Sequence, residues 1–205
     1  MHPFRPFIPL EGKGAHSALP LASPIHTMTS RLVFEPLRVS HLDELAVTLL
    51  HPDVYRYIED ELPSLSDFKL ALSVALAGPP ASASGQTWLH YLVRQADTGV
   101  MLGRLEATVH DAIAEVAFLF GPSHWGKGYA TEGLHWLHAE VERLCNVSDF
   151  WATTVPANLE CQALLRRCGY ASINGPTPQL FSFAPGDMVF RFERAARGKA
   201  GSALP

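Results

Sequence analysis

Residues 121–132 read GPSHWGKGYATE, and this stretch carries the strongest structural signal in the chain. A largely apolar run from Ala114 to Phe120 precedes it, and a segment with helical spacing of apolar residues follows from Gly128. A glycine-rich turn between a strand and a helix points backbone N–H groups at one spot, beside the positive end of the helix dipole. An anionic phosphate group suits such a spot. Gly126 and Gly128 have no Cβ atom, so the turn can be tight and a ligand can approach closely.

The residues of this turn alone leave three interpretations open. The turn is a sharp connection without a ligand, a nucleotide-binding P-loop, or a loop that binds another phosphate-containing ligand. Gly121, Gly126 and Lys127 nearly match the P-loop pattern GxxxxGK[ST]. However, Gly128 stands where that pattern needs a hydroxyl group for the magnesium ion, which disfavours the P-loop.

Outward from this turn, the chain alternates between extended and helical patterns. Asp97-Thr98-Gly99 is typical of a hairpin turn. The patterns predict strands over 31–37, 88–93, 100–109, 114–120, 150–155, 170–174 and 187–193. They predict helices over 40–49, 66–77, 128–144 and 158–168, the first two capped by Ser40 and Ser66. One face of the longest helix would carry Ala130, Leu134, Leu137, Val141 and Leu144. The order βααβββαβαββ predicts an α/β sheet with helices on both faces.

Composition narrows the classes of protein and partner. The chain of 205 residues suits one domain, or one domain with a small appendage. Its 16 basic and 20 acidic residues give a net charge of −4, which argues against nonspecific binding to nucleic acid. No apolar run reaches the ~20 residues of a membrane-spanning helix. The 3 cysteines lack paired spacing, which argues against a disulfide framework or a structural zinc site. We expect a soluble cytoplasmic protein without nucleic-acid or membrane partners.

The two ends of the chain differ from its middle. Residues 1–30 hold 5 of the 16 prolines and 3 charged residues, without any helical or alternating period. They also lack the basic start and continuous apolar run of a signal peptide. We expect an extended or disordered arm over 1–30, a domain over 31–194 and a C-terminal tail over 195–205. Met28 directly precedes the first predicted strand and is a candidate for the natural start.

The glycine-rich turn resembles the Q/R-x-x-G-x-G/A signature of the GNAT superfamily of N-acyltransferases. Gly126 and Gly128 fall on the two glycines, whereas Ser123 replaces the usual Gln or Arg. The residues at 114–118 and 125–132 are similar to one branch of that superfamily, which reads approximately AEIGY and then WGKGYATEA. That branch contains the Rim-type acetyltransferases of ribosomal-protein N-termini.

Two further blocks carry the same resemblance. Residues 158–170, NLECQALLRRCGY, resemble the coenzyme-contacting segment N-x-x-S-x-x-L-L-x-x-x-G-F/Y of the superfamily. Residues 31–37, RLVFEPL, resemble the opening R-L-x-L-R-P-L. Together the matching blocks extend over about residues 29–193.

The resemblance implies a mixed, mostly antiparallel sheet that splays after its fourth strand, which opens a V-shaped cleft. It implies transfer of an acetyl group from acetyl-CoA, without a metal ion, to a primary amine on a protein N-terminus or a small molecule. Trp125 and Tyr129 cover the coenzyme or only anchor the loop. A coenzyme-binding or interaction module that has lost catalysis is the alternative. The residues implied to bind the coenzyme are Phe118, Leu119, Phe120, Trp125, Gly126, Lys127, Gly128, Tyr129, Ala130, Thr131 and Asn158.

Amide formation requires a neutral amine, although a free primary amine has a pKa of about 10, so a general base is expected. Glu115 matches the strand-four Glu that the family places beside its cleft. Burial among apolar residues is expected to raise the pKa of Glu115 into a useful range. Alternatively, Glu115 forms a structural ion pair with Arg104 or Arg31. Weaker candidates for the base are Glu106, His110 and Asp111.

A general acid for the departing thiolate is harder to find. Many relatives have a Tyr seven residues after the Asn, where this chain has Leu165. Cys161 replaces the Ser that this branch places near the sulfur, and it either assists catalysis as a weak donor or simply packs. Tyr55 and Tyr57 lie where acceptors enter family clefts, and they contact the acceptor or pack. The oligomeric state stays open, with a homodimer as one option.

Overall fold

The structure is a computed structural model that describes residues 27–58 and 61–193. Residues 1–26 of the expected arm, residue 194 of the expected domain and the expected tail over 195–205 lie outside the described residues. Residues 27–30 are described, and they belong to a hairpin. Strand β1, Thr27–Met28, pairs antiparallel with β2, Leu32–Pro36. The folded unit therefore begins earlier than the predicted boundary at residue 31.

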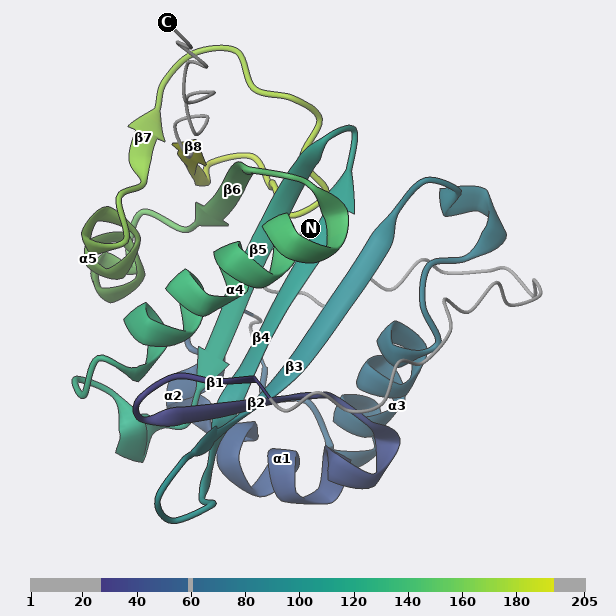
Figure 1. Ribbon diagram of the computed structural model, residues 1–205, viewed down its shortest axis with the longest axis vertical. Coiled ribbons are helices and arrows are strands. Elements are labelled where there is room, and N and C mark those ends of the chain that lie inside the picture. Colours follow the sequence, from purple (N-terminus) through teal and green to yellow (C-terminus); the bar gives the residue numbers. More distant parts are fainter. Residues whose placement is uncertain (1–26, 59–60, 194–205) are drawn as a thin grey trace, which may run out of the picture.

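The described strands form one sheet in the order β1-β2-β3-β4-β5-β6-β8-β7 (Figure 1). Neighbouring strands are antiparallel except for the parallel pair β5–β6. This arrangement confirms the predicted mixed, mostly antiparallel sheet. The remaining strands are β3 Thr87–Gln95, β4 Met101–His110, β5 Ile113–Phe120, β6 Asp149–Thr154, β7 Ala171–Ile173 and β8 Met188–Glu193.

Helices lie on both faces of this sheet, as predicted (Figure 1). Strand alternation explains how one strand serves both faces. On β3, Tyr91 and Val93 belong to the large core under the longest helix, whereas Leu92 packs with Leu45 and Phe68 from two shorter helices. The helices are α1 Leu42–Leu49, α2 Pro52–Tyr55, α3 Leu65–Leu76, α4 Tyr129–Cys145 and α5 Leu159–Arg167, and the 3-10 turns are η1 Val39–His41, η2 Ala81–Ala83 and η3 Pro122–His124.

Two predicted N-caps are wrong by a few residues. Helix α3 is capped by Ser64, whose hydroxyl accepts a hydrogen bond from Asp67 N at 3.1 Å, and Ser66 lies inside the first turn. Ser40 lies inside η1, so His41 is the residue that precedes α1. Neighbouring serines offer equivalent caps in sequence, and tertiary packing decides between them.

Helix α4 has the predicted apolar face over most of its length. Leu134, Leu137 and Val141 are fully buried, but Leu144 is 47% exposed near the end of the helix. The helix then ends at Asn146, which adopts a left-handed backbone with φ of 55°. The first turn of α4, residues 129–132, lines the cleft that forms the candidate site.

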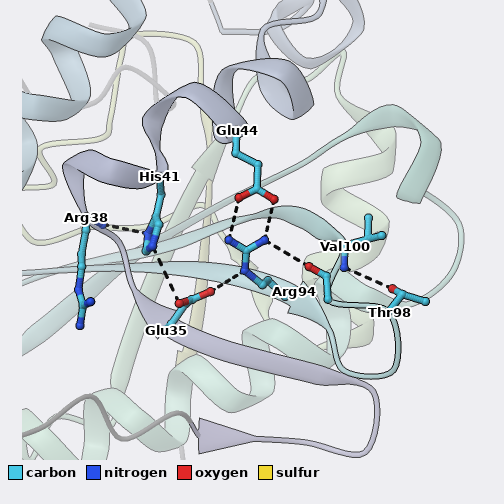
Figure 2. Close-up of polar contacts among 8 residues, drawn as sticks. Glu35, Arg38, His41, Glu44, Arg94, Thr98 and Val100 are labelled. Carbon is cyan, nitrogen blue, oxygen red and sulfur yellow. Dashed lines mark hydrogen bonds and ion pairs between the residues drawn. The ribbon is translucent and has the colours of Figure 1, made fainter.

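Arg94 on β3 connects helix α1 to the neighbouring end of the sheet (Figure 2). Its guanidinium donates to Glu35 Oε1 on β2 at 2.6 Å and to both carboxylate oxygens of Glu44 on α1 at 2.7 and 2.8 Å. It also donates to the carbonyl of Gly99 in the β3–β4 turn. The hydrogen bonds from Arg94 lower the pKa of Glu44 despite some burial. This network links α1 to β2 and to the β3–β4 turn.

Candidate active site

Strands β5 and β6 part in the middle of the sheet. Their register pairs end at Glu115 and Trp151, although β5 continues to Phe120 and β6 stays paired with β8 as far as Thr154. This confirms the predicted splay of the strand at 114–120. A cleft of about 780 Å³ opens beyond the parting point, and its walls come from the β1–β2 turn, α2, the end of β5, the start of α4, and α5.

The turn before α4 opens onto this cleft. Gly126 and Gly128 adopt left-handed φ angles of 72° and 78°, which glycine tolerates better than any other residue. Gly128 is the N-cap of α4 and provides no side-chain acceptor for the first N–H groups of the helix. Trp125 anchors the turn, since its indole nitrogen donates to the carbonyl of Phe120 at 2.7 Å. The first turn of α4 therefore presents backbone donors to the cleft.

Arg31, from the β1–β2 turn, also contacts the turn before α4 and the first turn of this helix. Its guanidinium lies 2.6 Å from Glu132 in the first turn of α4, and it donates to the carbonyl of Lys127 at 2.9 Å. It also lies 5.1 Å above the ring of Tyr129. Sequence reasoning missed this contact because the partners are 101 residues apart. Arg31 thus pairs with Glu132 and not with Glu115.

Glu132 is held as a carboxylate by this contact. Burial alone would raise the pKa of Glu132, but hydrogen bonds from Thr29 and Arg31, together with the charge of Arg31, lower it overall. The Thr29 hydroxyl donates to the same carboxylate. The β1–β2 hairpin is therefore bound to the start of α4 by an ion pair and a hydroxyl group.

Asn158 and Cys161 lie on the opposite wall of the cleft, at the start of α5. Asn158 Oδ1 accepts a hydrogen bond from Cys161 N at 3.0 Å and so caps the helix. Burial raises the pKa of the Cys161 thiol to about 11, although the neighbouring Thr154 lowers it in part. The thiol stays protonated near neutral pH. Leu165 is fully buried in the core.

The lip of the cleft is a short helix that the sequence analysis missed. His51 caps α2 by accepting a hydrogen bond from Asp53 N, and Pro52 takes the first helical position. Proline suits that position because its missing N–H group would have no partner there. Tyr57, just after α2, lines the cleft, whereas Tyr55 packs between the two main hydrophobic clusters.

Glu115 lies at the parting point of the strands but not in the cleft lining. Its carboxylate accepts hydrogen bonds from His110 Nε2 at 2.7 Å, from the backbone of Phe181 at 2.8 Å and from Ser182. Burial would raise the pKa of Glu115, but these hydrogen bonds lower it overall. The expected rise in this pKa is therefore wrong, because the sequence does not show the donors that surround the carboxylate.

The weaker base candidates are also paired. Arg104 is bonded to Glu106, and His90 lies 3.5 Å from the same carboxylate. Although burial acts in the other direction, Arg104 and His90 lower the pKa of Glu106 to about 2. His110 contacts Asp111 at 3.1 Å as well as Glu115. Within the described residues these side chains form structural pairs.

The structure brings most of the predicted site residues together in one cleft. Lys127, Tyr55 and Glu115 are not in its lining. The lining contains Tyr57, Phe118, Leu119, Phe120, Trp125, Gly126, Gly128, Tyr129, Ala130, Thr131, Asn158 and Cys161. It also contains residues that the sequence analysis did not select, among them Arg31, Arg56, His124 and Arg167.

Residues 27–58 and 61–193 contain neither a cluster of metal-ligating side chains nor a membrane-spanning helix. No three His, Cys, Asp or Glu side chains there lie close enough to hold a metal ion together. Nor does any helix in these ranges have the length and apolar character needed to cross a membrane.

Three solved structures share the fold of this chain. RimL, a ribosomal-protein alpha-N-acetyltransferase solved with coenzyme A, superposes with a TM-score of 0.65 at 15% identity, over 82% of this chain and 97% of RimL. Spermidine N-acetyltransferase from Vibrio cholerae, solved with CoA and spermine, gives 0.60 at 16% identity, over 80% and 94%. A GNAT acetyltransferase from Bacillus anthracis gives 0.62 at 15% identity, over 81% and 96%.

The sequence comparisons are of two kinds. A comparison with curated proteins found no match. Residues 31–171, more than half of the chain, match the family model described as "Acetyltransferase (GNAT) domain". This match overturns the P-loop interpretation of the glycine-rich turn. The chain belongs to the GNAT acetyltransferase domain family.

Proposed function

We propose that the protein transfers an acetyl group from acetyl-CoA to a primary amine. The observation that carries the proposal is that two features open onto one cleft. The uncapped first turn of α4, with Gly126 and Gly128, offers donors for a diphosphate. The end of β5, which has parted from β6, offers backbone groups for an extended arm. A coenzyme A thioester has both parts.

The cleft residues would bind the coenzyme in sections. The N–H groups of residues 126–131 and the dipole of α4 would hold the diphosphate, with Arg31 and Arg167 as further positive charges in the lining. Residues 118–120 of β5 would hold the pantetheine arm. A backbone N–H there would stabilise the oxyanion that forms when the amine attacks. Asn158 would donate from its side-chain nitrogen, since its oxygen caps α5.

The reaction is a direct displacement. The neutral amine nitrogen bonds to the thioester carbonyl carbon, the tetrahedral intermediate collapses, and the C–S bond breaks to release the coenzyme thiolate. The amine loses one proton and the thiolate gains one, so the overall transfer is balanced. An ordinary thiol has a pKa of about 8.5, which makes the thiolate a fair leaving group without an acid.

The catalytic roles of Glu115 and Cys161 stay predictions. Cys161 lines the cleft as a protonated thiol, so it can donate a weak hydrogen bond to the departing sulfur. Its pKa of about 11 makes complete proton transfer to that sulfur unfavourable. Glu115 is ionised, as a base must be, but it accepts several hydrogen bonds and does not line the cleft.

The proposed acceptor is a protein N-terminus or a small amine. RimL, one structural neighbour, is an acetyltransferase of ribosomal-protein N-termini, and another acts on spermidine. The Rim-type resemblance of the sequence favours an N-terminus. The lip at Asp53, Arg56 and Tyr57 would then contact the first residues of the acceptor peptide. The aromatic ring of Tyr57 would stack against that peptide.

A coenzyme-binding module without catalysis is the second candidate. It is favoured by a specific observation: Leu165, where many relatives have the acidic Tyr, is fully buried in the core and cannot substitute for it. Such a module would bind acetyl-CoA and release no thiol with any acceptor.

Calorimetry and a thiol-release assay test both candidates. We expect acetyl-CoA to bind without magnesium, ATP-magnesium to bind far more weakly, and free thiol to appear with at least one member of a panel of N-terminal peptides and polyamines. Binding without thiol release across the panel would favour the module. Tight binding of ATP-magnesium with no binding of acetyl-CoA would contradict both.

A further inference from the structure

The carboxylate of Glu115 is saturated with hydrogen bonds. Oε1 accepts from His110 Nε2 at 2.7 Å and from Phe181 N at 2.8 Å. Oε2 accepts from Ser182 N at 2.9 Å and from Ser182 Oγ at 2.5 Å. An ionised carboxylate has about four acceptor sites, so all of them are in use. The residue is 6% exposed, so its carboxylate is almost entirely shielded from solvent.

Ser182 is held from both of the parting strands. Glu115 on β5 accepts from its N–H and hydroxyl groups, and Thr153 on β6 donates to its carbonyl oxygen at 3.1 Å. Glu115 and Trp151 form the last register pair between these strands. Ser182 therefore bridges β5 and β6 at the fork, where pairing stops and the cleft begins.

Apolar contacts reinforce this bridge. Leu180 packs with Ile113 of β5, Trp151 of β6 and Val189 of β8 in a separate small core. The ring of Phe181 lies 4.4 Å from the ring of His110. The segment between β7 and β8 is thus fixed to the fork by its residues 180–182, on the sheet face opposite α4.

We propose that Glu115 is a positioning residue: together with Thr153 it fastens Ser182 across the fork and so fixes how far β5 and β6 part. The inference rests on the proposed function, because the width of the fork matters for the thioester arm that the end of β5 would hold. In this account Glu115 acts through Ser182 and accepts no proton from the amine. A small change at the fork shifts residues 118–120, and a misplacement of about 1 Å can cost about 100-fold in rate.

The test is a double-mutant cycle with Glu115→Gln and Thr153→Val. A glutamine keeps the shape of the side chain but turns one acceptor into a donor that faces the backbone N–H of either Phe181 or Ser182. Valine keeps the shape of Thr153 and removes its donor. We expect kcat/KM for acetyl-CoA to fall about 10-fold in E115Q and about 3-fold in T153V, as for buried hydrogen bonds. Because both act through Ser182, the double variant should fall about 10-fold, not about 30-fold. Thr87→Val, on β3 and separated from β5 by β4, is the control.

Two further readouts separate positioning from base catalysis. Amide hydrogen exchange at Phe181 and Ser182 should become faster in both variants, and the acidic limb of the pH profile of kcat/KM should persist in E115Q. The inference is overturned if E115Q abolishes that limb with exchange unchanged, or if the two substitutions are additive. If the wild-type protein releases no thiol at all, the proposed function fails separately. Hydrogen exchange and the affinity for acetyl-CoA then still decide whether Glu115 and Thr153 act as one unit.

Discussion

Two helices begin at the cleft, and they treat their first N–H groups differently. Helix α5 starts at Asn158, whose side-chain oxygen accepts a hydrogen bond from Cys161 N. Helix α4 starts at Gly128, which has a φ of 78° and no side chain. Glycine at an N-cap costs only a few tenths of a kcal/mol relative to serine or asparagine, but it leaves the N–H groups without a side-chain acceptor. Helix α5 thus has a side-chain acceptor at its start, whereas α4 has none, which is what the proposed diphosphate site requires.

The contacts of the turn before α4 support this difference between the two helices. The α4 turn is fixed from outside, by Trp125 to the end of β5 and by Arg31 to Lys127 and Glu132. These contacts use carbonyl and carboxylate oxygens, not the N–H groups of residues 129–131. A loop that is rigid but keeps its donors is prepared for an anion before the anion arrives.

The largest effect is expected from Gly128→Ala at the uncapped start. A non-glycine residue in the left-handed region costs about 1–2 kcal/mol, and here the strain would distort the donors that we propose bind the diphosphate. We expect the affinity for acetyl-CoA, measured by calorimetry, to fall about 10- to 100-fold. Gly99→Ala is the matched control. Gly99 has a φ of 68° in the β3–β4 turn, and an added Cβ atom there would meet nothing within 4 Å.

Both glycine variants should lose a similar free energy of unfolding, and only G128A should lose affinity. If G128A and the wild type bind acetyl-CoA with equal affinity, the start of α4 does not bind the diphosphate and the proposed difference between the two helices is wrong.

Asn158→Ala tests whether the N-cap of α5 only stabilises the helix or also contacts the coenzyme. Loss of an N-cap costs about 1 kcal/mol of unfolding free energy, and we expect this from denaturant titration of N158A. Ser64→Ala removes the cap of α3 and should cost about the same. If Asn158 also contacts the coenzyme, N158A alone should weaken acetyl-CoA binding, by about 3-fold. Identical binding in N158A and S64A would mean that Asn158 is only a cap.

Glu132, in the first turn of α4, is expected to make the free energy of unfolding depend on pH. The pKa of Glu132 is lowered in the folded state, so its contribution to stability is complete above the unfolded-state pKa of an ordinary Glu. That contribution is lost as the pH falls through the lowered value. We expect the unfolding free energy of E132Q to depend less on pH below about 4.5 than that of the wild type. Glu160→Gln, in the first turn of α5, is the control; an equal change in E160Q would count against the Arg31 contact.

The smallest effect is expected from Cys161→Ala. Because its thiol has a pKa of about 11, Cys161 is no effective acid for the departing thiolate. We expect kcat to fall by less than about 3-fold, the loss of one weak hydrogen bond. A loss of about 100-fold, restored in C161S, would instead assign the group a direct role at the sulfur.

Much of this comparison can be predicted from the sequence, because local signals mark it. Gly126, Gly128 and Asn158 stand at positions where the chain must change from a strand or loop to a helix. The cap of α3 shows the limit of such signals, since Ser64 and Ser66 are equivalent until packing selects one.

Contacts between distant residues could not be predicted. The hydrogen bonds that Glu115 accepts from Phe181 and Ser182 join residues 66 and 67 positions apart, and those that Arg31 donates to Glu132 join residues 101 apart. No local pattern encodes such pairs. For this reason a strand Glu that resembled a catalytic base in sequence has, in the structure, a saturated carboxylate with a lowered pKa.

A titration of the 15N-labelled protein with acetyl-CoA tests the central claim most directly. We predict that the largest amide shifts occur at residues 126 and 128–131 and along 118–120 of β5, and that they are smaller at the start of α5. Shifts confined to other surfaces, with the amides at the start of α4 unchanged at saturation, would contradict the account.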